Sequence, residues 1–104
     1  MNKPFYERSK KERAHVEQPA IDFAQSRGWW HTKITSPTRD SLPDDLFVRD
    51  GVYVWWEFKA PGKEPTSKQF KRHREMGEHG MDVRWTDNLD AFKDVVTRCT
   101  HTKA

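Results

Sequence analysis

Residues 43–60 read PDDLFVRDGVYVWWEFKA, and this stretch decides the fold. Asp50-Gly51 lies between two runs rich in β-branched and aromatic residues, and a two-residue Asp-Gly link of this kind favours a tight β-hairpin. The pattern predicts strands over about 46–49 and 52–59. The hairpin then determines which side chains of the stretch lie together.

Side chains alternate between the two faces of a strand, so the second strand carries two different sets of residues. One set is apolar and is expected to pack against helices: Val54, Trp56 and Phe58. The other set is mixed: Tyr53, Trp55, Glu57 and Lys59. A carboxylate and an ammonium that emerge together from a largely apolar strand are costly to bury unless they are paired or bound to a metal.

The register of the hairpin brings a second carboxylate to the mixed face. With a two-residue turn, Asp44 lies opposite Glu57, with Cβ atoms about 5 Å apart. Asp45 falls opposite Trp56 on the apolar face, which favours Asp44 over Asp45 as the functional acid. A β-bulge would shift the register by one residue and reverse this choice.

Asp44, Glu57 and Lys59 together predict metal-dependent hydrolysis of a phosphodiester. Two adjacent carboxylates repel each other unless a positive charge lies between them. Mg²⁺ is commonly held by one or two carboxylates, with water and substrate phosphate completing its coordination. The neighbouring lysine can orient or help deprotonate the attacking water and offset charge on the phosphate.

The flanking segments predict an α/β fold with a central mixed sheet flanked by helices, in the order αβββαβα. A helix is expected over 14–27, starting near Glu17 because Pro19 suits only a first turn, and Gly28 ends it. Thr66 and Gln69 have capping-box spacing at the start of a helix that runs to His79. The remaining expected elements are strands over 29–35 and 82–86 and a helix that starts at 87 or 88 and ends at 99.

Length and composition indicate one small domain. The chain has 104 residues with a formal charge of +3, and we expect a basic arm over 1–13, a domain over 14–100 and a tail over 101–104. The basic balance permits nucleic-acid binding without demonstrating it. The single cysteine, Cys99, excludes an internal disulfide. The sequence shows no membrane span and no apolar signal segment, so we expect a cytoplasmic, intracellular protein.

The same residues resemble a known family. Pro43-Asp44 followed by Glu57-Phe58-Lys59 resembles the PD-(D/E)xK nuclease motif, and the string EFKAPGKEPTSKQ over 57–69 is similar to VRR-NUC domains, small nucleases that occur in phages and in larger repair proteins. The likeness covers about residues 16–86. Further positions agree with that family: Glu17, Gly28 and Lys33.

The resemblance implies a restriction-endonuclease-like core and a role for several residues. It implies a site for Mg²⁺ or Mn²⁺ held by Asp44, Glu57 and the backbone carbonyl of Phe58. It implies a catalytic role for Lys59 and supporting catalytic roles for Glu17 and Gln69. The family often has glycine two residues before the Pro-Asp pair, where this chain has Ser41, so the loop could bend differently and displace Asp44.

Each of these residues also has a simpler structural interpretation. Glu57 and Lys59 could form an exposed ion pair of about 0–1 kcal/mol. Capping explains Gln69 without catalysis, and Glu17 could serve only as a favourable charge near a helix N-terminus. The spacing of His73 and His79 does not suit a zinc site. Cationic residues that could contact phosphates, or serve only solubility, are Lys33, Lys63, Lys68, Lys71 and Arg72.

Three functions remain open at this point. The first is a Mg²⁺- or Mn²⁺-dependent endonuclease acting on DNA, with a preference for branched, flap or junction structures that only the resemblance suggests. The second is a catalytically inactive nucleic-acid-binding module with the same fold. The third is a partner-binding protein with an aromatic surface. A homodimer would suit symmetrical junctions, but the sequence does not establish one.

Overall fold

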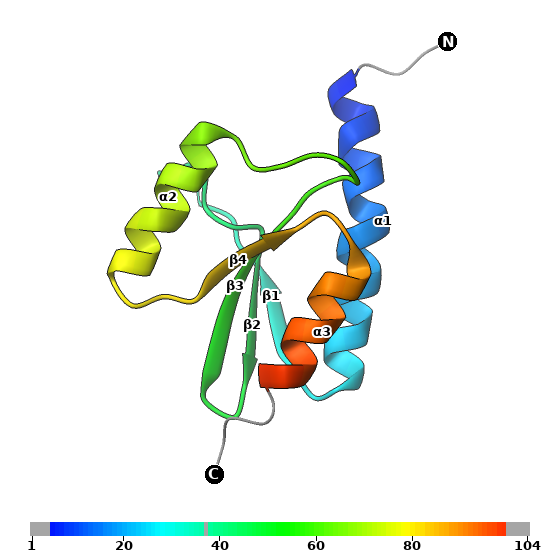
Figure 1. Cartoon of the computed structure of the whole chain (residues 1–104), viewed down its shortest axis with the longest axis vertical. Coiled ribbons are helices and arrows are strands. Elements are labelled where there is room, and N and C mark those ends of the chain that lie inside the picture. The colour runs from blue at the N-terminus through cyan, green and yellow to red at the C-terminus, as the bar shows by residue number, and fades with distance from the viewer. Residues whose placement is uncertain (1–4, 37, 100–104) are drawn as a thin grey trace.

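The computed structural model describes residues 5–36 and 38–99. The expected order of elements, αβββαβα, is confirmed (Figure 1). In chain order the elements are α1 (Phe5–Ser26), β1 (Trp30–Lys33), β2 (Asp45–Arg49), β3 (Val52–Phe58), α2 (Ser67–Glu78), β4 (Val83–Thr86) and α3 (Leu89–Cys99). The predicted tail over 101–104 lies outside the described residues, and the division between arm and domain stays a prediction.

The four strands form one mixed sheet in the order β1-β2-β3-β4. β1 and β3 pair antiparallel with β2, and β4 pairs parallel with β3. Asp50 and Gly51 both have positive φ angles, 50° and 81°, as a tight hairpin turn requires. The predicted register is confirmed, because Arg49 pairs with Val52 and Asp45 pairs with Trp56.

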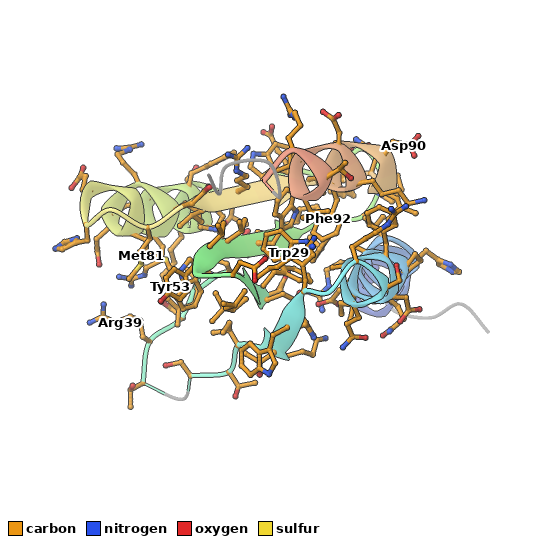
Figure 2. The ribbon with its side chains drawn as sticks, turned by 90° about the horizontal axis from the view of Figure 1, so that it is seen from below. Trp29, Arg39, Tyr53, Met81, Asp90 and Phe92 are labelled. Carbon is orange, nitrogen blue, oxygen red and sulfur yellow. The ribbon has the colours of Figure 1, made fainter. Side chains whose placement is uncertain are left out.

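Helices cover the sheet unequally. Figure 1 shows α1 and α3 side by side against one face, whereas α2 lies on the other side, next to β4. On the face under α1 and α3, the ring of Phe92 lies 4.8 Å from that of Trp56, 5.1 Å from Phe47 and 5.5 Å from Phe58. Figure 2 shows Phe92 pointing from α3 toward the sheet and Asp90 pointing away from it. A core of large aromatic rings thus compensates for the low apolar fraction of the chain.

Two expectations about the first helix and the tryptophans are wrong. α1 begins at Phe5 instead of near Glu17, and Pro19 lies inside it. The proline lacks an N–H and its ring crowds the carbonyl four residues before it, but α1 has 22 residues and continues on both sides. The strand predicted over 29–35 is rich in aromatic residues, which would be expected to pack in the core and the sheet, but Trp30 is 60% exposed. It lies on the edge strand opposite Val48, on the face that α1 and α3 do not cover; Trp29 and Trp56 are buried as expected.

The predicted start of α2 is confirmed in detail. Thr66 Oγ1 accepts a hydrogen bond from the Gln69 N–H at 3.1 Å, and the Thr66 N–H donates to Gln69 Oε1 at 2.9 Å. The two bonds satisfy two backbone donors at the helix N-terminus.

No helix within the described residues is long and apolar enough to cross a membrane, and the expected intracellular location stays a prediction.

Candidate active site

The end of the sheet where β2 begins and β3 ends holds Asp44 in place. The backbone oxygen of Asp44 accepts a hydrogen bond from the Ile34 N–H at 2.8 Å. Its side-chain Oδ2 accepts from the Phe58 N–H, at the end of β3, at 3.0 Å. The carboxyl group of Asp44 is therefore held by the end of β3, and its backbone is held by the residue that follows β1.

The loop before Asp44 bends as the glycine of the resembling family would allow. Ser41 has a φ of 62°, in the left-handed region that glycine adopts freely and that costs other residues about 1 kcal/mol or more. Ser41 thus takes the conformation that the substituted glycine would favour. The concern that the loop would displace Asp44 is not supported.

Glu57 lies on the face of the sheet that α2 covers. Its side chain is 1% exposed, and its Oε2 lies 3.6 Å from Lys59 Nζ. Oε1 lies 3.6 Å from Nε2 of His73 on α2 and has no hydrogen-bond partner among the described residues. A buried carboxylate with one oxygen unsatisfied is costly in a site that only stabilises the fold.

Asp44 is also close to two carboxylates on the opposite side of the sheet. One oxygen each from Glu17 on α1, Asp44 and Asp45 lies within 4.8 Å of the others. Asp45 is fully buried, and its Oδ1 lies 2.6 Å from Nε2 of His31 on β1. Its Oδ2 has no hydrogen-bond partner in the described structure. Asp44 therefore lies between Glu57 on one side and Glu17 with Asp45 on the other.

Two carboxyl groups of this cluster, those of Asp44 and Asp45, have pKa values well above their usual range. Burial and the nearby charge of Glu57 raise the pKa of Asp44 to about 7. Burial and the contact with Glu17 raise the pKa of Asp45 to about 9. Burial alone would raise the pKa of Glu17, but the contacts with Asp45, Lys33 and Arg13 outweigh it and lower that pKa. Protons thus provide part of the positive charge that this cluster needs.

The geometry fits a divalent cation. Ligand oxygens about 2.1 Å from Mg²⁺ lie about 3–4 Å from one another in an octahedral shell. The oxygens of Glu17, Asp44 and Asp45 all lie within 4.8 Å of one another, so small side-chain movements would bring them around one ion. The unsatisfied oxygens of Asp45 and Glu57 are further acceptors that a cation could satisfy. Ligation by Asp44, Glu57 and the Phe58 carbonyl stays a prediction.

Two positively charged side chains contact this cluster, one from α1 and one from β1. Arg13 Nη1 lies 3.6 Å from Asp44 Oδ1, and Lys33 Nζ lies 3.2 Å from Glu17 Oε2. Lys33 was expected to bind nucleic acid. Here it faces Glu17 while remaining more than half exposed, so it is able to reach a phosphate only by leaving that ion pair.

The other residues singled out from the sequence lie on α2 or before it. Gln69 uses its Oε1 in the capping box. Lys68 contacts Asp40, and Arg72 pairs with Glu75 at 2.9 Å. Lys63 and Lys71 are exposed.

Sequence reasoning missed four residues of the cluster: Arg13, His31, Asp45 and His73. Asp45 carried a usable signal, because an aspartate predicted on an apolar face needs a partner. Arg13 lies four residues before Glu17, a spacing that places two helical residues side by side. Nothing local marks His31 or His73, since their contacts depend on how the elements pack.

Comparison with known proteins agrees with the fold. The fold matches a solved structure described as a "VRR_NUC domain", with a TM-score of 0.75 and 19% identity, over 88% of this chain and 98% of the other. The chain is 30% identical over 76 residues to "Putative nuclease p44" of Acyrthosiphon pisum secondary endosymbiont phage 1. That match covers 72% of this chain and 82% of the relative. No model of a protein family matches the chain.

The fold is that of a VRR_NUC domain, with the mixed, helix-flanked sheet that was predicted. With the sequence match to a phage nuclease beside it, the chain belongs to the VRR-NUC family. The resemblance drawn from 43–69 is thereby confirmed.

Proposed function

We propose that this chain is a divalent-metal-dependent deoxyribonuclease that cuts within DNA. The observation that carries the proposal is the position of Asp44. A hydrogen bond from the Phe58 N–H holds its carboxyl group in place. Glu57, which is ion-paired with Lys59, lies on one side of that group, and Glu17 and Asp45 lie on the other. A chain that only bound nucleic acid would gain nothing from four crowded carboxylates facing an anionic ligand.

Mg²⁺ or Mn²⁺ is the cofactor that this arrangement suits. Asp44 and Glu57 would hold the ion with the carbonyl of Phe58, and Glu17 would support it directly or through water. When bound, the ion supplies Lewis-acid polarisation of the scissile phosphate. It also removes the repulsion between the carboxylates, which otherwise raises the pKa of Asp44.

Lys59 is the residue we assign to the chemical step. Hydrolysis adds a water oxygen to phosphorus and breaks a P–O bond, and the leaving oxygen takes up a proton. Lys59 Nζ is largely buried and lies 3.6 Å from Glu57, so its position is fixed by the strand and by an ion pair. There it would orient the attacking water and offset negative charge on the phosphate. Any supporting role of Gln69 would use its amide nitrogen, because its Oε1 serves the cap.

The DNA backbone would lie along residues 38–42 and α2. A polar hollow of about 510 Å³ is lined there by Ser36, Thr38, Arg39, Asp40 and Arg72. Arg39 extends into solvent at this side of the molecule (Figure 2). Lys63, Lys68, Lys71 and Arg72 would contact phosphates, which position DNA without reading its sequence. We further propose a preference for branched, flap or junction DNA, where a homodimer would let two sites act on a symmetrical junction.

Cleavage of labelled DNA tests the proposal. Single-stranded, duplex, flap and four-way-junction substrates are each incubated with Mg²⁺, Mn²⁺ or EDTA. We expect metal-dependent cleavage that falls at least about 100-fold in Lys59→Ala. Lys59→Ala should still bind Mn²⁺, whereas Asp44→Asn should lose both binding and cleavage. Binding of DNA by wild type without cleavage of any substrate would instead support an inactive nucleic-acid-binding module.

A further inference from the structure

Arg13 occupies the carboxylate cluster in an unusual way. Its Nη1 lies 3.6 Å from Asp44 Oδ1, and its Nε lies 4.0 Å from Glu17 Oε1. The guanidinium therefore spans two of the three carboxylates whose oxygens lie within 4.8 Å of one another. Its side chain is 29% exposed, so it lies at the mouth of the site.

These contacts depend on charge and not on well-formed hydrogen bonds. Both distances exceed the roughly 2.7–3.2 Å of an N–H···O bond, and Nε has no hydrogen-bond partner within the part of the chain that the structure describes. An arginine that served only the fold would be expected to form the bidentate geometry for which its planar head is suited. Arg13 can therefore leave this position at a modest cost in free energy.

A cation bound by Asp44 and Glu17 would compete with Arg13 for the same oxygens. The guanidinium and a divalent ion a few ångströms apart also repel each other. The scissile phosphate must approach that ion, which brings an anion within reach of a side chain that starts 3.6 Å from Asp44. Arginine is well suited to bind such an anion at two oxygens.

We propose that Arg13 is a cation placeholder: it neutralises Asp44 and Glu17 in the metal-free protein and moves to a phosphate oxygen of the substrate when the ion binds. This inference rests on the proposed nuclease function and extends it to a residue of α1. It predicts two effects of opposite sign on removing Arg13. A purely structural ion pair would predict that metal affinity and activity fall together.

Arg13→Ala is the variant that separates these effects, with Arg98→Ala as a matched control. Arg98 pairs with Asp94 on the exposed side of α3 near its C-terminal end. Figure 1 shows this end of α3 at the hairpin end of the sheet, away from the point where β2 begins. Mn²⁺ affinity is measured without DNA by electron paramagnetic resonance. We expect Arg13→Ala to bind Mn²⁺ about five-fold more tightly, because it loses a competing ion pair. Single-turnover cleavage at saturating Mn²⁺ should fall about 10- to 100-fold, and Arg98→Ala should change neither quantity.

A measurement on the wild-type chain keeps the inference testable if Arg13→Ala does not fold. The ¹⁵N signal of the Arg13 Nε–H should move when Mg²⁺ is added, and should stay in place in Asp44→Asn.

The outcomes separate this inference from the proposed function. Unchanged or weaker Mn²⁺ binding by Arg13→Ala, or an unmoved Nε–H signal at saturating Mg²⁺, would overturn the placeholder. Tighter binding with unaltered cleavage would overturn the move to phosphate. If wild type binds Mn²⁺ and Arg13→Ala binds it more tightly, yet neither cuts DNA, the placeholder stands and the nuclease function fails.

Discussion

The two faces of β3 have opposite surroundings although their residues alternate along the same seven-residue strand. Trp56 is 1% exposed beneath α3, whereas Tyr53, on the open face of the same strand near the hairpin, is 62% exposed. α2 covers the open face only toward the other end of the strand, at Glu57. The residues that stabilise the fold are therefore concentrated on one face. The candidate catalytic residues lie where α2, a polar helix, covers the second face.

The contrast ends at Asp44 and Asp45, where the strand pair meets α1. Asp45 belongs by register to the apolar face, yet it is a fully buried carboxylate in contact with His31. Asp44 belongs to the face of Glu57 and is tied to the backbone of Phe58. The two adjacent carboxylates thus bring both faces into one cluster, and the core that packs against Trp56 also supports the site.

The largest expected effect is on stability, and it tests directly whether the two faces of β3 differ. Trp56→Ala should lower the free energy of unfolding by about 3–5 kcal/mol, because it leaves a cavity among aromatic rings. Tyr53→Ala should change it by less than about 0.5 kcal/mol, as is usual for an exposed side chain. Urea denaturation followed by tryptophan fluorescence measures both. Equal losses would show that the open face is covered in solution.

Much of the fold and part of the site could be predicted from local chemistry. A two-residue turn fixes the register of a hairpin, so the opposition of Asp45 and Trp56 and the separation of the two faces followed from Asp50-Gly51 alone. The capping box at Thr66 is equally local.

The contacts that the sequence did not predict join elements far apart in the chain. His73 reaches Glu57 from α2, and Arg13 reaches Asp44 from α1. These contacts depend on how helices pack on the sheet, which neither periodicity nor turn chemistry specifies. Asp45 was set aside because its face is apolar, although burial of a charge on that face is itself the unusual feature.

The second prediction concerns the cost of keeping Asp45 in the core. Burial and Glu17 raise its pKa to about 9 in the folded chain, whereas the unfolded chain has the ordinary value of about 3.9. Between these values the folded chain holds one proton more, so the free energy of unfolding falls as the pH rises. In EDTA we expect a fall on the order of 1 kcal/mol per pH unit between pH 7 and pH 8.5. Asp45→Asn should flatten this slope.

Three features keep the pH experiment specific. Burial lowers the pKa of His31, so this residue titrates below the chosen window. Asp44, with a pKa of about 7, contributes at the lower edge of the window only, so the slope above pH 7.5 reports Asp45. Asp94→Asn removes an exposed carboxylate of α3 and should retain the wild-type slope. A wild-type stability that is constant or rises from pH 7 to pH 8.5 would mean that Asp45 is ionised in the folded protein, with the shared proton on His31.

The smallest expected effect separates the two roles considered for Gln69. Gln69→Ala removes the acceptor for the Thr66 N–H and should lower the free energy of unfolding by about 0.5–1 kcal/mol. Gln69→Glu puts a carboxylate oxygen in place of the amide oxygen that accepts in the capping box, and it lacks the amide donor. We expect it to retain both stability and cleavage rate, since the contact seen in the structure uses only the oxygen. A tenfold slower cleavage by Gln69→Glu at unchanged stability would instead place the amide of Gln69 on the substrate. The capping box would then be the means by which α2 holds a catalytic residue beside the sheet.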